Sequence, residues 1–380
     1  MAALLCGVYL SGSRGVFLLL LPLALAWGVH RLVHLRDVKT VALAAGGMAA
    51  IGVLAVLLSG GLVLDRLRAI TLSSSSLNGR LLYYLDGAEM LLRHPLGVGY
   101  GGYLYLQPLE QTGVYTLRFI HNEYLQAALD GGIPAGLCMA GLSAALLLRR
   151  GAPVRERAVV FAIAAHACID FDFQFSAVAF LLLLCGSGGR CRELPLRRRR
   201  LSAGLAGAAA LVLCYFSTVY ALDFFSRPRE AWALFPADLS LAENRLQSFP
   251  DVDSAQPAAD AIIASTDLSL LAWDCKLAAA AQRADLPAMV ESKYQYLRLS
   301  RYRGEVYQDF ADLLENACVQ GSREELVRYK TLAQSVLSQL EEVNQATSPL
   351  AYRIADKPEL EFTPRIADRM NQIIERIDTP

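Results

Sequence analysis

The sequence predicts an all-α protein in which a polytopic transmembrane helical domain precedes a soluble helical tail. The 380 residues are 54% apolar and only 19% charged, with a mean hydropathy of +0.34. Soluble domains carry about 25% charged residues, so much of this chain is expected in lipid. Beyond Asp223 the composition becomes that of a soluble helical domain. We therefore expect a transmembrane domain over residues 1–223 and a tail over residues 224–380.

Five apolar runs are near or above the roughly 20 residues that a helix needs to cross a bilayer. The first is short unless it includes part of residues 1–13. The fourth is interrupted by a polar turn at residues 170–174, which favours two short helices that meet there. Such a break is tolerated where protein or water covers the backbone. The runs are residues 15–29, 40–59, 123–148, 158–186 and 201–223.

Three clusters of basic residues predict how these spans are oriented. By the positive-inside rule, short loops rich in Lys and Arg lie in the cytoplasm. All three clusters are cytoplasmic only if residues 158–186 cross the membrane and return as a hairpin. The loop 60–122 and the tail then lie on the extracytoplasmic side of the cell membrane. The clusters are Arg31, Arg36 and Lys39; Arg149, Arg150, Arg155 and Arg157; and Arg190, Arg192 and Arg197–Arg200.

The tail contains four segments with apolar residues at helical spacing, separated by short breaks. Tyr307 follows Leu271, and Tyr329 follows Tyr294, at an offset of 35–36 residues. This offset is close to the ~34 residues of a tetratricopeptide helix pair. One interpretation is an antiparallel, tetratricopeptide-like tail that docks a protein partner, and the other is a plain helical bundle. The segments are residues 268–284, 287–299, 304–319 and 322–343.

His121 is the best candidate for a catalytic residue. An imidazole titrates near ambient pH, which suits it to take a proton from an attacking hydroxyl. His121 stands just before an apolar span, so the site is expected at the outer face of the membrane. The neighbouring Asn122 or Glu123 is expected to hold the tautomer. An interfacial histidine that only caps a helix is the structural alternative, and the other motifs favour catalysis.

Arg14 and Arg80 are the candidate ligands of a diphosphate. A guanidinium offers a planar fork of donors to phosphate oxygens and stays charged at any relevant pH. Arg14 lies between apolar runs, and an unpaired charge at the bilayer centre costs about 2.5–3.5 kcal/mol or more. It is therefore expected to have a carboxylate or a bound anion as partner. For Arg80 the alternative is ordinary solvation, and Arg93 and Arg118 are interpreted as rim charges.

Other polar features are weaker signals. The glycines between residues 97 and 102 permit tight turns and a close approach to a bulky ligand, but they lack the frame of a phosphate-binding loop. Asp170 and Asp172 form a D-x-D pair, which we interpret as a solvated turn at the hairpin tip, with a His166–Asp170 pair as the alternative. Cys and His show no metal-ligand spacing. We predict neither a metal nor a cofactor.

In their order and spacing, these motifs resemble the O-antigen ligase and polymerase family of polytopic membrane glycosyltransferases. The resemblance covers residues 11–174 and does not reach the tail. The matching pieces are SGSRG at 11–15, HPLGVGYGGY at 94–103, HNEYLQ at 121–126, GGIP at 131–134 and HACIDFDF at 166–173.

The resemblance implies an enzyme that moves a glycan from an undecaprenyl-diphosphate carrier to an acceptor hydroxyl on the extracytoplasmic face. His121 would deprotonate the acceptor, and Arg14 and Arg80 would bind the leaving diphosphate in a displacement with inversion. No nucleotide sugar or metal is implied. The expected partners are the lipid-linked glycan, a glycan or lipid acceptor and membrane lipid, with no nucleic acid. Ligase, polymerase and protein glycosyltransferase activities all fit the motifs.

The chain also departs from the family pattern. Family members usually have more spans than the five or six expected here, and the tryptophan that usually follows the Arg80 position is absent. Met1–Leu10 lacks the basic segment of a cleavable signal peptide, so we expect Met1 to lie inside a longer ancestral membrane domain. The alternative function is a non-catalytic membrane anchor, or a partner-dependent fragment, that presents the tail to other proteins.

Overall fold

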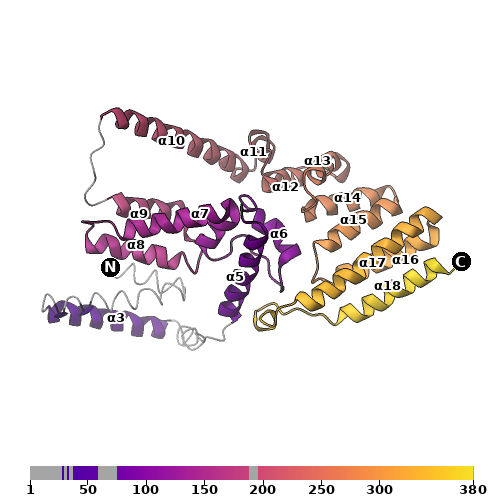
Figure 1. Ribbon diagram of the computed structural model, residues 1–380, viewed down its shortest axis with the longest axis horizontal. Coiled ribbons are helices and arrows are strands. Elements are labelled where there is room, and N and C mark those ends of the chain that lie inside the picture. The colour runs from indigo at the N-terminus through magenta and orange to yellow at the C-terminus, as the bar shows by residue number, and fades with distance from the viewer. Residues whose placement is uncertain (1–27, 30–31, 34–36, 59–74, 188–195, 380) are drawn as a thin grey trace. The chain divides into compact units, whose positions relative to one another are not determined.

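The computed structural model describes residues 28–29, 32–33, 37–58, 75–187 and 196–379. Within these ranges the chain forms 15 α-helices and two short 3-10 helices, and no strand is present there (Figure 1). The prediction of an all-α protein is confirmed for this part of the chain.

The predicted membrane runs that fall on described residues are helical. They correspond to α3 (Val38–Leu58), α7 (Glu123–Leu147), α8 (Val154–His166), α9 (Ser176–Ser187) and α10 (Leu196–Phe224). The predicted polar break is present, because the 3-10 helix η1 (Asp172–Gln174) separates α8 from α9. Except for residues 28–29, the first predicted run, 15–29, lies outside the described residues.

Two helices of the described chain are long and apolar enough to cross a membrane, at Glu123–Leu147 and Arg199–Phe224. Shorter apolar stretches occur at Val38–Gly47 and Ser176–Gly186. On α10, large side chains such as Leu205, Leu211 and Leu213 are exposed. An exposed apolar surface of this kind is typical of a site of membrane or protein contact. The number of spans and their orientation stay predictions.

The described chain divides into two compact units. The first contains the residues up to Leu104, those from Tyr115 to 187, and the segment Ser348–Lys357 from the tail. The second contains Tyr105–Val114, the residues from 196 to Thr347, and those from Pro358 onward. The domain boundary after residue 223 stays a prediction, but the exchange of short segments shows that the chain does not fold in two simple blocks.

In the first unit, α5 (Ser75–Arg93) packs against α7, and α7, α8 and α9 follow one another side by side (Figure 1). The helix α7 is kinked at Gly132, where φ is 83°. The loop after α5 packs into this kink, because Val98 N donates to Leu129 O at 2.6 Å and Ile133 N donates to Pro95 O at 3.0 Å. A Cβ at Gly97 would lie 2.5 Å from Gly132 N. Gly97 thus permits two backbones to meet, whereas we had expected the glycines to approach a ligand.

The second unit contains α6 from Tyr105 onward (α6 spans Gly102–Glu110), α10, and the tail helices. The four predicted tail segments correspond to α14–α17, and four further helices were not predicted. The tail helices are α11 (Pro228–Leu234), α12 (Leu239–Gln247), α13 (Val252–Ser265), α14 (Leu270–Gln282), α15 (Leu286–Arg298), α16 (Gly304–Gln320), α17 (Arg323–Ala346) and α18 (Phe362–Asp378).

Short polar side chains begin most of these tail helices. Asp238, Asp251, Ser269 and Asp285 each accept a hydrogen bond from a backbone N–H in the first turn, which satisfies a donor that has no partner within the helix. At α17, Ser322 and Glu325 form a reciprocal capping box. These local signals explain why the helices begin where they do.

Apolar faces of α15–α18 form the larger core of the tail. Its fully buried members include Tyr307 and Phe310 of α16, Val336 of α17, and Ile366 and Met370 of α18. A smaller cluster around Ala259 and Ala272 joins α13 to α14. Cys275 and Cys318 are free thiols. A helical tail is therefore present, while its tetratricopeptide-like character stays a prediction.

Candidate functional site

Helix α5 presents Arg80 and Tyr84 on one face, because residues four apart in a helix are neighbours on its surface. The helix lies close to the segment that leads into α7. Gly87 permits this approach, since a Cβ at that position would clash with the buried side chain of Ile120. The sequence just after Ile120 is therefore held beside the Arg80 face of α5.

His121 follows Ile120 and has a left-handed backbone, with φ of 55°. This conformation is uncommon for residues other than glycine and must be held by its surroundings. The next residue, Asn122, caps α7 by accepting from Leu125 N at 3.0 Å. On the other side, Ile120 N donates to Gln126 Oε1 at 3.0 Å, and the Tyr84 hydroxyl donates to His121 O at 2.6 Å. The backbone of His121 is thus restrained from both sides.

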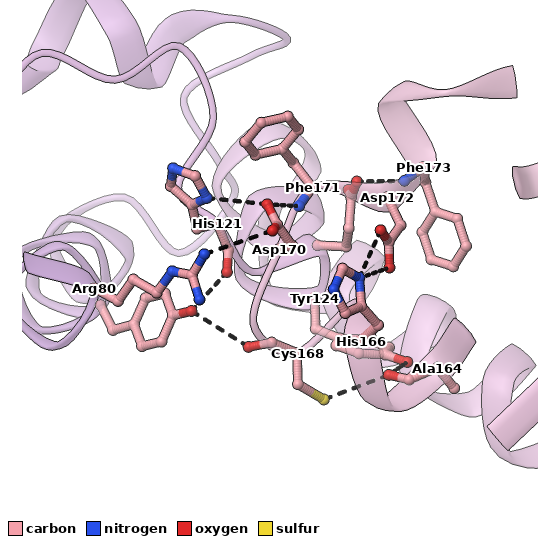
Figure 2. Close-up of polar contacts among 12 residues, drawn as sticks. Arg80, His121, Tyr124, Ala164, His166, Cys168, Asp170, Phe171, Asp172 and Phe173 are labelled. Carbon is pink, nitrogen blue, oxygen red and sulfur yellow. Dashed lines mark hydrogen bonds and ion pairs between the residues drawn. The ribbon is translucent and has the colours of Figure 1, made fainter. Parts of the chain in front are cut away.

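Asp170 joins the imidazole of His121 to the guanidinium of Arg80 (Figure 2). His121 Nδ1 lies 3.1 Å from Asp170 Oδ1, and Arg80 Nη2 lies 3.5 Å from Asp170 Oδ2. All three side chains are partly exposed, so a ligand has access to them. We call these residues the Arg80–Asp170–His121 cluster.

The Asp170 carboxylate determines which nitrogen of His121 is available. An ionised carboxylate only accepts hydrogen bonds, so Nδ1 carries the proton that Asp170 accepts. Nε2 therefore holds the lone pair. A neutral imidazole held in this way is suited to take a proton at Nε2, and the carboxylate stabilises the imidazolium that results.

Tyr84 ties three segments together at the edge of the cluster. Its hydroxyl donates to His121 O and also lies 3.4 Å from Cys168 O, just after α8. Burial is the main reason that the pKa of Tyr84 is raised to about 12, an effect that the nearby Arg80 opposes. The phenol therefore stays neutral and keeps its proton to donate at neutral pH.

Glu123 and Asn122 do not contact the imidazole as we had expected. The Glu123 carboxylate accepts from Phe173 N at 2.6 Å and from Gln174 Nε2 at 3.4 Å. The amide of Asn122 is occupied by the first turn of α7. Both side chains accept hydrogen bonds from other donors nearby. The residue that contacts His121 Nδ1 is instead Asp170, 49 residues further along the chain. Glu123 holds the turn that carries Asp170.

A second histidine–aspartate pair closes the same turn (Figure 2). His166 Nδ1 lies 2.8 and 2.7 Å from the two carboxylate oxygens of Asp172. As predicted, Asp170 and Asp172 lie in the turn between α8 and α9, where both are partly exposed, and each contacts a different histidine. His166 pairs with Asp172 and not, as the alternative had it, with Asp170. Within the described ranges, no group of three or more His, Cys, Asp or Glu is placed to hold a metal.

Aromatic rings cover one side of His121. The Phe171 ring lies 4.8 Å from the imidazole, centroid to centroid. The Phe171 ring in turn lies 5.9 Å from the Phe119 ring and 6.3 Å from the Phe175 ring. Arg118 lies over the Phe119 ring at 5.6 Å, and Arg93 forms an ion pair with Glu89. Arg14 lies outside the described residues.

Sequence reasoning gave Tyr84 no role in the site and gave Asp170 only that of structural support. The spacing of four residues between Arg80 and Tyr84 is a signal that helical periodicity offers. Asp170 was visible as a charge within an apolar run, and such residues often mark functional sites. Its partner was not visible, because the contact depends on how α8 packs against α7.

A family model described as O-antigen ligase matches residues 1–140. This part of the chain, 140 of its 380 residues, is therefore similar to the O-antigen ligase family. The matched region contains Arg14, Arg80 and His121. Asp170 lies beyond the matched O-antigen ligase residues, so the cluster combines side chains from inside and outside the match. Neither curated proteins nor solved structures show a match to the chain.

Proposed function

We propose that this protein transfers a glycan from an undecaprenyl-diphosphate carrier to an acceptor hydroxyl at the extracytoplasmic face of the cell membrane. The observation that carries the proposal is the Arg80–Asp170–His121 cluster, in which one carboxylate lies between a permanent cation and an imidazole. The O-antigen ligase match over residues 1–140 supports the same reaction class.

In the proposed reaction, Arg80 binds the diphosphate of the donor. A guanidinium has five N–H donors, and only Nη2 approaches Asp170. The remaining donors are available to phosphate oxygens in the planar, paired geometry that Arg favours. Arg14 is proposed as a second cation at the same diphosphate. Two cations would stabilise the charge that develops as the diphosphate leaves.

His121 acts as the general base. Nε2 takes the proton of the acceptor hydroxyl while the oxygen forms a bond to the anomeric carbon. The bond from that carbon to the carrier phosphate breaks, and its electron pair leaves with the diphosphate. Because attack occurs opposite the leaving group, the configuration at the anomeric carbon inverts. The imidazolium then releases its proton to solvent or to the freed diphosphate.

The acceptor is a glycan or lipid hydroxyl, delivered from the membrane surface. In this proposal the loop 60–122 and the tail share the extracytoplasmic side. The tail is proposed to be a docking element of the tetratricopeptide-like type for a protein partner. In this proposal the tail binds a partner and takes no part in the chemical reaction.

The test is a transfer assay with the full-length protein in lipid nanodiscs, an undecaprenyl-diphosphate-linked glycan and an acceptor. His121→Ala is expected to lower kcat by about 10²–10⁴-fold, the usual contribution of a general base. His94→Ala, a change of another histidine in the same loop, is the matched control and should transfer normally. Normal transfer by His121→Ala would remove the proposed base and favour a non-catalytic anchor.

A further inference from the structure

A short tail segment, Ser348–Lys357, belongs to the unit that contains the candidate site. We call this segment the strap. Its residues Ala351 and Ile354 are 0% and 4% exposed, and they form one buried cluster with Leu82 of α5 and with Tyr115. More than two hundred residues of chain separate Leu82 from the strap. The sequence had placed the strap in a docking tail, whereas the structure packs it on the helix that carries Arg80.

The strap packs on the side of α5 that faces away from the site. Two residues along a helix correspond to about 200° around its axis, so Leu82 points away from Arg80 and Tyr84. Asp86 lies one turn beyond Leu82 on the same face, and its Oδ2 accepts from the Tyr115 hydroxyl at 2.5 Å. The Tyr83 and Tyr115 rings lie 4.5 Å apart. Helix α5 is thus held between the site on one face and the strap with Tyr115 on the other.

We propose that Ile354 and Ala351 of the strap are positioning residues, which hold α5 in the orientation that brings Arg80 to the donor diphosphate. The inference rests on the proposed function of Arg80, but the packing of the strap on α5 is tested separately. If the strap leaves, the Leu82 face loses its apolar cover, although the Tyr115–Asp86 hydrogen bond remains. Near His121, α5 is then held by the Gly87–Ile120 contact and the Tyr84 hydroxyl. Small shifts of α5 would move the Arg80 guanidinium, and a misplacement of about 1 Å can cost about 10²-fold in rate.

The strap also bears on how the chain is oriented across the membrane. Leu82 and Tyr115 lie in the loop 60–122, and Ala351 and Ile354 lie in the tail. Residues that pack in one buried cluster lie on the same side of a bilayer. The strap therefore supports a shared side for the loop and the tail, independently of the positions of basic residues.

The decisive variant is Ile354→Ser in the full-length protein in nanodiscs, because it places a hydroxyl in the apolar contact with α5. Hydrogen exchange of the α5 amides around Arg80 is expected to become faster. In the transfer assay, the KM for the lipid-linked donor should rise about tenfold with little change in kcat, the pattern of weakened donor binding. Ile354→Val, which keeps the apolar contact, should restore both readouts.

Ile366→Ser is the matched control, because Ile366 is buried in the α18 core of the tail and not in the strap cluster. Tyr352→Ser changes an exposed strap residue and should have no effect. Unchanged α5 exchange and donor KM in Ile354→Ser would overturn the proposal, as would equal effects of Ile354→Ser and Ile366→Ser. If Ile354→Ser does not fold, the milder Ile354→Ala provides the same comparison.

The two proposals fail in different ways. If Arg80→Ala raises the donor KM while Ile354→Ser changes neither readout, the strap inference is wrong and the proposed function stands. If Arg80→Ala and His121→Ala both transfer normally, the proposed function is wrong. In that case the exchange rates of α5 alone decide whether the strap holds the helix. Arg93→Ala, a change of an exposed arginine at the C-terminal end of the same helix, is the control for Arg80→Ala.

Discussion

At the scale of single residues, His121 owes its candidate role to backbone and side-chain contacts that come from distant segments. Its left-handed backbone is restrained by the Tyr84 hydroxyl, and its imidazole by the Asp170 carboxylate. The adjacent Asn122 and Glu123 serve other donors. Sequence motifs therefore indicated His121 as the candidate base, but the sequence neighbours did not indicate its partner, because Asn122 caps the first turn of α7.

Asp170→Asn should lower kcat by about 10- to 100-fold, since a hydrogen bond to a charged group contributes about 1.5–3 kcal/mol. The amide nearly preserves the shape of the side chain but cannot stabilise the imidazolium, and its NH₂ group favours the wrong tautomer of His121. The assay is the same glycan transfer reaction with saturating donor and acceptor. Glu89→Gln, which neutralises an exposed carboxylate of α5, is the control. An unchanged kcat in Asp170→Asn would contradict a role for this carboxylate in orienting the base.

At the scale of elements, the kink of α7 and the turn after α8 position the site. The loop at Pro95–Val98 packs into the kink at Gly132, which joins the end of α5 to α7. The turn between α8 and α9 is closed by the His166–Asp172 pair and by the Glu123 carboxylate. These two contacts fix the ends of the two segments that carry Arg80 and Asp170.

Substitutions of two glycines in the same loop distinguish the cost of backbone strain from the cost of lost close packing. Gly97 and Gly99 both have φ of 86°, but only Gly97 lies against Gly132. Gly99→Ala should destabilise the folded state by about 1–2 kcal/mol, the cost of a left-handed non-glycine residue. Gly97→Ala should cost more, because its Cβ would also displace the backbone of α7. Denaturant unfolding of the two full-length variants in detergent measures the difference, and equal losses would contradict close packing at the kink.

At the scale of the whole molecule, the placement of charge and the strap suggest one topology. The basic cluster at Arg149–Arg157 lies between α7 and the start of α8, and the positive-inside rule places it in the cytoplasm. The strap packs with Leu82 and Tyr115 of the loop 60–122, so we expect the loop and the tail on one side of the membrane and the basic cluster on the other.

Cysteine labelling tests this topology in intact cells. In a background without native cysteines, Leu92→Cys of the loop and Val319→Cys of the tail occupy exposed positions. Both should react with a membrane-impermeant thiol reagent that is present on the extracytoplasmic side of the cell membrane. Val154→Cys, exposed beside the basic cluster, should react only after the membrane is opened. Opposite accessibility of Leu92→Cys and Val319→Cys would contradict both the topology and the strap.

Most of the helices were predictable because their signals are local. Apolar runs of sufficient length indicated the helices of the membrane half, and helical spacing indicated α14–α17. Helices α5 and α6 were missed because they lie in the stretch predicted as the loop 60–122. Helices α11–α13 and α18 were also missed: the first three are short or rich in alanine, and α18 follows a proline-containing break. The segment exchange between the two units was not predictable, since no periodicity records which distant face a segment will cover.

For the site, the sequence by itself determined which side chains are candidates, His121 and Arg80, because an imidazole can accept a proton and a guanidinium can bind phosphate. Tertiary structure alone decided that Asp170 joins them, that Glu123 and His166 hold the turn of Asp170, and that the tail's Ile354 packs behind Arg80. Side-chain type and spacing are properties of the chain, and they set what a residue does chemically. Contacts between segments tens or hundreds of residues apart depend instead on helix packing, which brings together groups that the linear order separates.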